Sequence, residues 1–380
     1  MKISSEERFC CYLLHAIDLS PNHIRALRQN FTSAKSAITE SGSLEWQALR
    51  FSTNAVESLR QLQEQGRLHA RLAKEYEEAR AQGFEFLVDE EIANLFVSLG
   101  GNDVPFGIWV HGKTSILFSA AAKVAIVGTR RPSFYGKAVC ADIAKTLGKL
   151  SVVVVSGLAR GIDTIAHQNA MEAGADTIGV LGTGLNCFYP PENKKLQREI
   201  IPSQGLVLSE FPLTTNSNAF NFPRRNRLIA ALSLGIVVVE GDNKSGALIT
   251  ARSAALQGKD VFAVPGNINS PMSYAPNLLI KEGAVPLTNV NDLAEAMPEL
   301  QSLSKSLNNH HNGDVAGEIN RKDLEPRAKK ILSVLSSEPM ALDAILNSTG
   351  LGLDQANQIL LELELSGLIL NCSPFGYATR

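Results

Sequence analysis

The sequence predicts an α/β fold, in which a parallel sheet covered by helices on both faces follows a small helical domain. The chain has 380 residues, and at about 150 residues per domain this length suggests two or three domains. Its first part places apolar side chains at helical spacing, whereas from Lys123 onward short β-branched runs alternate with segments of helix length. That alternation is typical of parallel strands joined by right-handed helical crossovers.

The N-terminal part, residues 1–100, contains almost no strand-like runs. A stretch such as "VESLRQLQEQGRLHARLAKEYEEARAQG" repeats its apolar side chains at the spacing of helical turns, which indicates amphipathic helices. We therefore expect residues 1–100 to form a small helical domain.

The central part, residues 105–295, is expected to form the sheet. Its continuously apolar runs are, in chain order, "KVAIVG", "VVVVS", "DTIGVLG", "LVLSE", "GIVVVEG" and "DVFAVPG". Strands of this kind are buried on both faces of a sheet. Ligands bind an open parallel sheet at the carboxyl ends of its strands, so the loops that follow these runs form the candidate site.

The C-terminal part divides into a linker and a second folded unit. Residues 296–324 are polar and lack periodicity, which predicts a linker of low order. His310 and His311 lie in it without further metal ligands nearby, and we interpret them as solvated. Residues 325–380 suggest three short helices and a hairpin, the order of a winged helix. The third helix, residues 353–365, carries acidic but no basic side chains, which favours a protein partner over duplex DNA.

Composition excludes several classes of protein. The formal net charge is -2, with 44% hydrophobic and 19% charged residues, so we expect an ordinary globular protein rather than a globally basic binder. The five cysteines are scattered without metal-ligand spacing, which predicts buried thiols in a reducing compartment and no metal site. No apolar run is long enough to cross a bilayer. We expect a cytoplasmic protein without a membrane partner.

Glycine-rich loops follow the first two strands of the predicted sheet. The first contains Gly128, Thr129 and Arg130, and the second contains Gly157, Arg160 and Asp163. Exposed amides, helix N-termini and arginines can together hold phosphate. Alternatively, the glycines only form tight turns and Asp163 only caps a helix. Neither loop matches GxGxxG or GxxxxGK[ST], so we expect no dinucleotide or other cofactor.

The densest basic cluster lies in "FPRRNR", after the fourth strand. Its members are Phe222, Arg224, Arg225, Asn226 and Arg227. Pro223 suits the first turn of a helix, where arginines oppose the helix dipole unless an anion binds them. Glu210 or Glu240 could pair with one arginine, but three arginines exceed this supply. We therefore predict contacts with external phosphate, and a base stacked on Phe222.

Two later loops add donors to the same edge of the sheet. After the third strand, "YPPENK" brings Lys194 close behind Tyr189. The ring of Tyr189 could stack on a base, but we expect it to pack the loop. After the fifth strand, "EGDNKSGALITA" places Ser245 and Gly246 at the start of a helix. Hydroxyl and backbone donors at a helix start can contribute to anion binding.

As a set, these loops resemble the DNA processing protein A family, also called Smf. The resemblance rests on "VAIVGTRRPSFYG", "SGLARGIDTIAH", "GTGLNCFYPPEN", "FPRRNRLIAALS", "EGDNKSGALITA" and "VFAVPGN", and it covers residues 105–292. It implies an extended Rossmann-like core between a SAM-like helical domain and a winged helix. It also implies binding of single-stranded DNA without sequence preference, homodimerisation, and loading of the RecA recombinase onto incoming DNA during natural transformation.

The family's motifs map onto particular residues of this chain. Its GSR-type loop falls on Gly128, Thr129 and Arg130, with Thr129 in place of the usual serine, and its F-x-RN segment falls on residues 222–226. Its SGLA-GID loop falls on residues 156–163. The sequence departs from the family after the Tyr-Pro pair, because Pro191 and Glu192 replace a residue that is often basic, and Lys194 is the nearest substitute.

The competing interpretation is an enzyme of the same broad fold that cleaves the N-glycosidic bond of a nucleotide, as phosphoribohydrolases do. Glu210 or Glu240 would assist its catalysis, but the PGGxGTxxE signature is missing. We therefore expect a non-catalytic DNA-binding mediator. The residues expected to neutralise phosphates are Arg130, Arg160, Arg224, Arg225 and Arg227.

Overall fold

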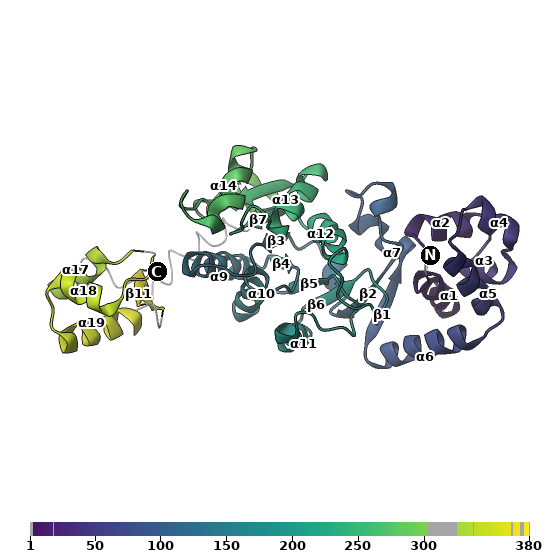
Figure 1. The fold of residues 1–380 in the computed structure, drawn as a ribbon, viewed down its shortest axis with the longest axis horizontal. Coiled ribbons are helices and arrows are strands. Elements are labelled where there is room, and N and C mark those ends of the chain that lie inside the picture. Colours follow the sequence, from purple (N-terminus) through teal and green to yellow (C-terminus); the bar gives the residue numbers. More distant parts are fainter. Residues whose placement is uncertain are drawn as a thin grey trace.

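The structure is a computed structural model, and it describes residues 3–17, 19–301, 325–336, 338–365, 368–372 and 376–379. Along the chain, a helical region is followed by a nine-stranded sheet with helices on both faces, and then by a small unit of three helices and a hairpin (Figure 1). This architecture confirms the predicted fold class.

Six helices form the N-terminal domain: α1 (Ser5–His15), α2 (Pro21–Gln29), α3 (Ala34–Glu40), α4 (Ser43–Ala48), α5 (Thr53–Gln63) and α6 (Arg67–Ala81). Serine side chains cap several of their N-termini; Ser4 and Ser20, for example, accept hydrogen bonds from the backbone amides of Glu7 and His23. Such caps satisfy amides that have no partner within the helix. They help to define where each helix begins.

The sheet begins earlier than we predicted. β1 (Phe84–Val88) and β2 (Gly107–Gly112) pair with each other in antiparallel fashion and form one edge of the sheet. β1 lies within residues 1–100, so this range is not purely helical. Tyr12 of α1 packs its ring against Phe86 and Trp109 of these strands. The helices and the sheet edge therefore share one core, which explains why hydrophobic spacing alone did not reveal the boundary.

β2 also pairs with β6 (Leu206–Ser209) in antiparallel fashion, and from β6 onward the sheet is parallel. After β2 the strand order is β6, β5 (Thr177–Leu181), β4 (Val153–Ser156), β3 (Lys123–Val127), β7 (Gly235–Val238), β8 (Asp260–Ala263) and β9 (Val285–Pro286). Strands β3 to β8 coincide with the six apolar runs singled out in the sequence. The chain moves from β3 toward β6 and then crosses back to β7, so the order reverses between β3 and β7.

Helices cover both faces of this sheet (Figure 1). One layer consists of α9 (Phe134–Lys149), α10 (Ile162–Glu172), α11 (Lys194–Ile200) and α15 (Asn291–Ala296). The other consists of α12 (Asn221–Ala231), α13 (Gly246–Leu256) and α14 (Tyr274–Lys281). Short elements complete this part: α7 (Asp89–Ile92), α8 (Ser115–Phe118), η1 (Ala93–Leu95), η2 (Gly101–Asp103), η3 (Pro191–Asn193) and η4 (Pro271–Ser273). Because both faces are covered, the strands are apolar throughout.

The C-terminal unit is the predicted winged helix. It contains α17 (Pro326–Val334), α18 (Leu342–Thr349), α19 (Leu353–Leu365), β10 (Ile369–Asn371) and β11 (Tyr377–Thr379). The predicted linker is wrong at its start, because Met297 and Leu300 are buried against the sheet. The remainder of the linker, with His310 and His311, lies outside the described residues. None of the helices that the structure describes combines the length and apolar character needed to span a bilayer.

Candidate nucleic-acid interface

A groove runs along the carboxyl ends of the strands, at the point where the strand order reverses. Its main hollow has a volume of about 720 Å³ and is lined by the loops after β3 and β7, including Gly128, Lys244 and Ser245. A second hollow of about 410 Å³ adjoins it, and a small pocket completes the groove; Arg130 and Phe222 line all three. This is the position at which open α/β sheets bind ligands.

The groove presents cations that the protein itself does not neutralise. Arg130, Arg131 and Lys244 line it and are exposed, and within the described part of the chain none of the three forms an ion pair. Asp163 and Asp242 are the acidic residues of the lining. Asp242 accepts a hydrogen bond from the amide of Lys244 at 2.9 Å, which holds that loop in a turn. The groove therefore offers unpaired positive charge to an anion.

The loop after β3 is held rigidly, so Arg130 projects from a fixed base. The amide of Thr129 donates to the carbonyl of Glu240 at 2.7 Å, and the carbonyl of Thr129 accepts from the amide of Ile162 at 3.2 Å. The carboxylate of Glu240 accepts from the amide and hydroxyl of Ser133, at 2.8 and 2.6 Å. Gly136 leaves the room for that carboxylate, because a Cβ there would lie 2.1 Å from its Oε2.

Phe222 forms the aromatic wall of the groove, as its position in the sequence led us to expect. The guanidinium of Arg130 lies 5.4 Å from the centroid of its ring, and the ring of Tyr189 lies 5.5 Å away. The ring packs onto Gly182, where a Cβ would come within 2.8 Å of it. Tyr189 does pack the loop, as predicted, but it also lines the groove.

Two arginines of the densest basic cluster share one internal acid. Glu210 is buried at the end of β6 and accepts hydrogen bonds from Arg224, at 3.1 Å, and from Arg227. Arg227 is itself buried, whereas about half of the Arg224 side chain is exposed. Neither is among the residues that line the groove. The prediction that Arg227 contacts phosphate is wrong, because its side chain is buried against Glu210 and lies outside the groove lining. Arg224 contacts the same acid and, although it is half-exposed, is not among the residues that line the groove.

Arg225 is also an internal residue, with only 4% of its surface exposed. Its Nη1 donates to the carbonyl of Gly157 at 2.5 Å and to that of Val180, and its Nε donates to the side chain of Asn226. Burial lowers the pKa of Arg225 to about 10, although the charge of Asp163 opposes this shift. The guanidinium stays charged at neutral pH. It joins the ends of β4 and β5 and is also one of the residues that line the main hollow, so its charge adds to that of the groove although its hydrogen bonds are internal.

Asp163 is not only a helix cap, which was the alternative interpretation of its position in the sequence; it also closes a loop. Gly161 is the N-cap residue of α10, and it adopts a φ of +77°, which favours glycine. The carboxylate of Asp163 accepts from the amide of Ala159 at 3.2 Å and thereby closes the loop after β4. Burial raises the pKa of Asp163, while the charge of Arg225 lowers it. Gly157 is required beside this pair, because its Cβ would lie 2.5 Å from Nη2 of Arg225.

The remaining predicted residues divide into those inside and those beside the groove. Arg160 lines it but is bonded to Glu192 at 2.6 Å in an exposed ion pair. Lys194 lies outside the lining and sits 5.0 Å from the centroid of the Phe188 ring. Thr129, Asn226 and Gly246 line the groove together with Ser245. Ser245 uses its hydroxyl to cap α13, accepting from the amide of Ala247 at 3.2 Å.

Sequence reasoning missed Arg131 and Lys244 as lining residues. Both lie in loops that follow parallel strands, β3 and β7, and this position is the signal that could have identified them. They are less densely clustered in the sequence than the arginines of α12, so the pattern there is weaker.

The two carboxylates considered as catalytic, Glu210 and Glu240, are both engaged, with arginines and with Ser133 respectively. Among the described residues no cluster of histidine, cysteine, aspartate and glutamate could hold a metal ion.

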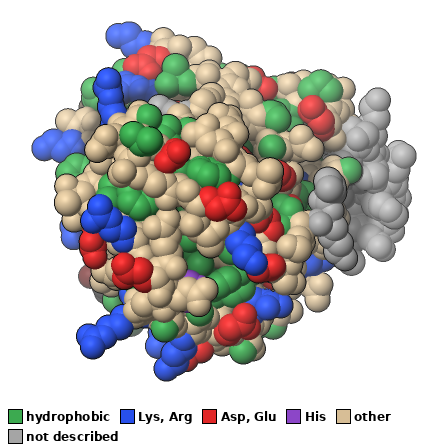
Figure 2. Space-filling view, turned by 90° about the vertical axis from the view of Figure 1, so that its right-hand side faces the viewer, with side chains coloured by type: hydrophobic (Ala, Val, Ile, Leu, Met, Phe, Trp, Pro, Cys, Tyr) green, Lys and Arg blue, Asp and Glu red, His purple; other side chains and the backbone are tan. Residues whose placement is uncertain are grey.

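Other surfaces suit a polyanion less well. Figure 2 views the molecule from the helical-domain end and shows basic and acidic side chains intermixed there. A further hollow of about 780 Å³ is lined mainly by α9 and residues 287–291, with apolar side chains such as Val139, Ile143 and Leu287. The groove at the strand ends is therefore the candidate site.

Two family models match the chain. The model described as DNA recombination-mediator protein A matches residues 84–298, and the model described as DprA winged helix domain matches residues 320–373. The first match begins at β1, in agreement with the sheet boundary in the structure.

Curated proteins and solved structures give the same result. The chain is 36% identical to Protein Smf of Escherichia coli over 280 residues, which is 73% of each chain. A structure of DNA processing protein A from Streptococcus pneumoniae superposes with a TM-score of 0.64 and 32% identity, covering 78% of this chain and 98% of that one. The Helicobacter pylori protein, whose structure is described as revealing its single-stranded DNA binding mode, gives 0.51 and 32%, with coverage of 60% and 96%. The resemblance drawn from the sequence is confirmed.

Proposed function

The chain belongs to the DNA recombination-mediator protein A family, and from this premise we propose that it binds single-stranded DNA in the groove without sequence preference. The supporting observation is the set of exposed, unpaired cations beside an aromatic wall, namely Arg130, Arg131 and Lys244 near Phe222. Single-strand binders combine a positive groove with aromatic rings in this way.

In this proposal the backbone phosphates follow the loops after β3 and β7. Arg130, Arg131 and Lys244 neutralise them, and the exposed residue Gly246 lets a phosphate approach the N-terminus of α13, which has open space beside it. A base stacks near Phe222, whose ring the neighbouring Arg130 and Tyr189 hold in place. None of these contacts reads a base edge, so binding is independent of sequence.

The test is fluorescence anisotropy with single-stranded DNA, duplex DNA and RNA at several salt concentrations. The groove variant Arg130→Ala/Lys244→Ala should bind every single strand more weakly, by roughly tenfold at 0.15 M salt, and its salt slope should fall by about 1.4, or about 0.7 per lost contact. Lys74→Ala/Lys149→Ala removes the same charge from exposed sites outside the groove and serves as the matched control. Equal affinity and slope in the groove variant and the control would refute the placement.

We further propose that the protein acts in the cytoplasm as a homodimer that protects incoming DNA and loads RecA during natural transformation. The family's description as a recombination mediator supports this role. The direct test measures the rate of RecA assembly on single strands with and without the protein. If the groove variant accelerates assembly as well as the wild type does, DNA capture in the groove is not part of loading. Light scattering tests the dimer.

We also propose that the protein catalyses no reaction on nucleotides. The engagement of Glu210 with arginines and of Glu240 with Ser133 supports this, and neither carboxylate is among the residues that line the groove. Incubation with nucleoside monophosphates should release no free base. Release that is lost in Glu240→Gln would favour a phosphoribohydrolase instead.

A further inference from the structure

A second cationic cluster lies beside the groove, on α11. It consists of Phe188, Lys194 and Arg198, and we call it the α11 patch. Nζ of Lys194 lies 5.0 Å and Cζ of Arg198 lies 5.3 Å from the centroid of the Phe188 ring. Both cations are exposed, and they are one helical turn apart, at positions i and i+4. One aromatic ring thus gathers two positive charges.

The two cations of the α11 patch have no acid left to neutralise them. The nearby carboxylates are those of Glu192 and Glu199, and each is already paired: Glu192 with Arg160 at 2.6 Å, and Glu199 with Lys195 at 3.4 Å. In the described residues neither Lys194 nor Arg198 forms an ion pair. Like charges at i and i+4 destabilise a helix, and an external anion between them would reverse that effect.

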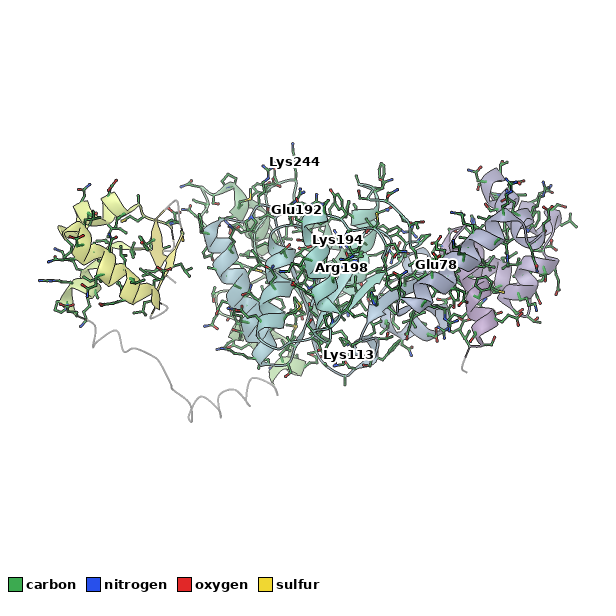
Figure 3. The ribbon with its side chains drawn as sticks, turned by 90° about the horizontal axis from the view of Figure 1, so that it is seen from below. Glu78, Lys113, Glu192, Lys194, Arg198 and Lys244 are labelled. Atoms are coloured by element: carbon green, nitrogen blue, oxygen red, sulfur yellow. The ribbon has the colours of Figure 1, made fainter. Side chains whose placement is uncertain are left out.

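The α11 patch is continuous with the groove. Tyr189 and Pro190 line the groove and directly follow Phe188 in the chain. Arg160 also lines the groove, and its partner Glu192 lies in η3, immediately before α11. In Figure 3, Lys244, Glu192, Lys194 and Arg198 follow one another across the core.

We propose that the α11 patch is a second phosphate site for the same DNA strand, so that the strand leaves the groove past Tyr189 and crosses α11. This proposal rests on the proposed function. It makes Arg198 a DNA-contacting residue, which neither the motifs nor the groove lining identified. It also makes the footprint on the DNA longer than the groove itself.

Length dependence distinguishes the α11 patch from the groove. The probes are oligothymidylates from about 4 to about 16 nucleotides, a range that matches known single-strand site sizes. Lys194→Ala/Arg198→Ala should bind the short probes as the wild type does. For the long probes, we expect affinity to fall roughly tenfold at 0.15 M salt and the salt slope to fall by about 1.4.

The matched control is Lys195→Ala/Lys149→Ala. Lys195 lies between the two patch cations in sequence, but it is paired with Glu199, so we expect the control to keep the wild-type affinity and slope at every length. Phe188→Leu should give a smaller loss, confined to long probes, because it frees the two cations without removing them. Thermal unfolding of each variant verifies the fold.

Two results would overturn the proposal. One is a patch variant that binds long probes like the control. The other is a patch variant that loses affinity equally at all lengths, which would place Lys194 and Arg198 within the groove site. Failure of the proposed function gives a different pattern, because Arg130→Ala/Lys244→Ala would then bind probes of every length as the wild type does.

Discussion

The helix α12 and the loop after β3 both carry adjacent arginines, but they use them in opposite ways. On α12, Arg225 and Arg227 are buried and bonded to internal acceptors. After β3, Arg130 and Arg131 are exposed, without an ion pair in the described chain. The denser cluster is largely buried in the framework, and the sparser pair is exposed in the groove.

The difference shows that charge density along a sequence does not identify a binding surface. What decides the role of an arginine is the supply of acceptors around it in three dimensions. At α12 these acceptors are Glu210 and the carbonyls that end β4 and β5. Variants that separate stability from DNA binding therefore test the comparison directly.

The largest effect is expected from Arg225→Met. The substitution leaves the carbonyls of Gly157 and Val180 without their donor and leaves Asp163 buried without a compensating charge. We expect the free energy of unfolding to fall by about 3–5 kcal/mol, measured by urea denaturation. Arg224→Met, on the same helix but half-exposed, is the control and should cost about 1 kcal/mol or less. Equal losses would contradict the assignment of Arg225 to the framework.

A smaller effect is expected from Gly157→Ala. Its Cβ would lie 2.5 Å from Nη2 and 2.7 Å from Cζ of Arg225, which is fixed by its hydrogen bonds. Such overpacking typically costs about 1–3 kcal/mol, measurable by the same denaturation. Gly246→Ala is the control, since nothing lies within 4 Å of the added atom, and its stability should stay within about 0.5 kcal/mol. A neutral Gly157→Ala would mean that Arg225 can move freely.

Most of the fold could be predicted from the sequence, because burial on both faces leaves a local record. The runs from "KVAIVG" to "DVFAVPG" are strands in the structure for that reason. β1 could not be predicted in the same way. Its burial comes from helices such as α1, whose Tyr12 contacts Phe86, and this contact has no signature within either segment.

The candidate site could be predicted only as a set of loops. Gly128, Arg130 and Phe222 lie in the groove because the carboxyl ends of parallel strands meet at one edge. The role of Arg225 could not be predicted, because its acceptors lie 68 and 45 positions away in the chain. Backbone carbonyls are present at every residue, so no residue type marks those that will bind an arginine.

A third variant tests whether water is excluded from the buried residues around Arg225. His167 of α10 is fully buried, and its Nδ1 lies 2.6 Å from the hydroxyl of Thr177. Burial lowers the pKa of His167 to about 3. The unfolded chain therefore takes up the proton first, so the stability from this residue is present above about pH 6.5 and is lost as the pH falls.

Between pH 6 and pH 5 this residue should contribute a loss of up to about 1.4 kcal/mol per pH unit. His167→Gln should make the pH dependence of the free energy of unfolding shallower by that amount, measured by urea denaturation across the range. Stabilities at pH 8, where the histidine is neutral in both states, supply the reference for each protein. An unchanged slope would mean that His167 is hydrated in the folded protein.

The smallest effect on stability is expected from Arg130→Ala, although this residue belongs to the proposed DNA site. Its side chain is exposed, and its one recorded partner among the described residues is the ring of Phe222, at 5.4 Å. An exposed cation–π contact is worth about 0.5–1 kcal/mol, so urea denaturation should show a change no larger than this. Because the amide and carbonyl of Thr129 hold the loop, truncating the neighbouring side chain leaves its anchor intact. A loss as large as that of Arg225→Met would place Arg130 in the framework as well, and the contrast between the two regions would then disappear.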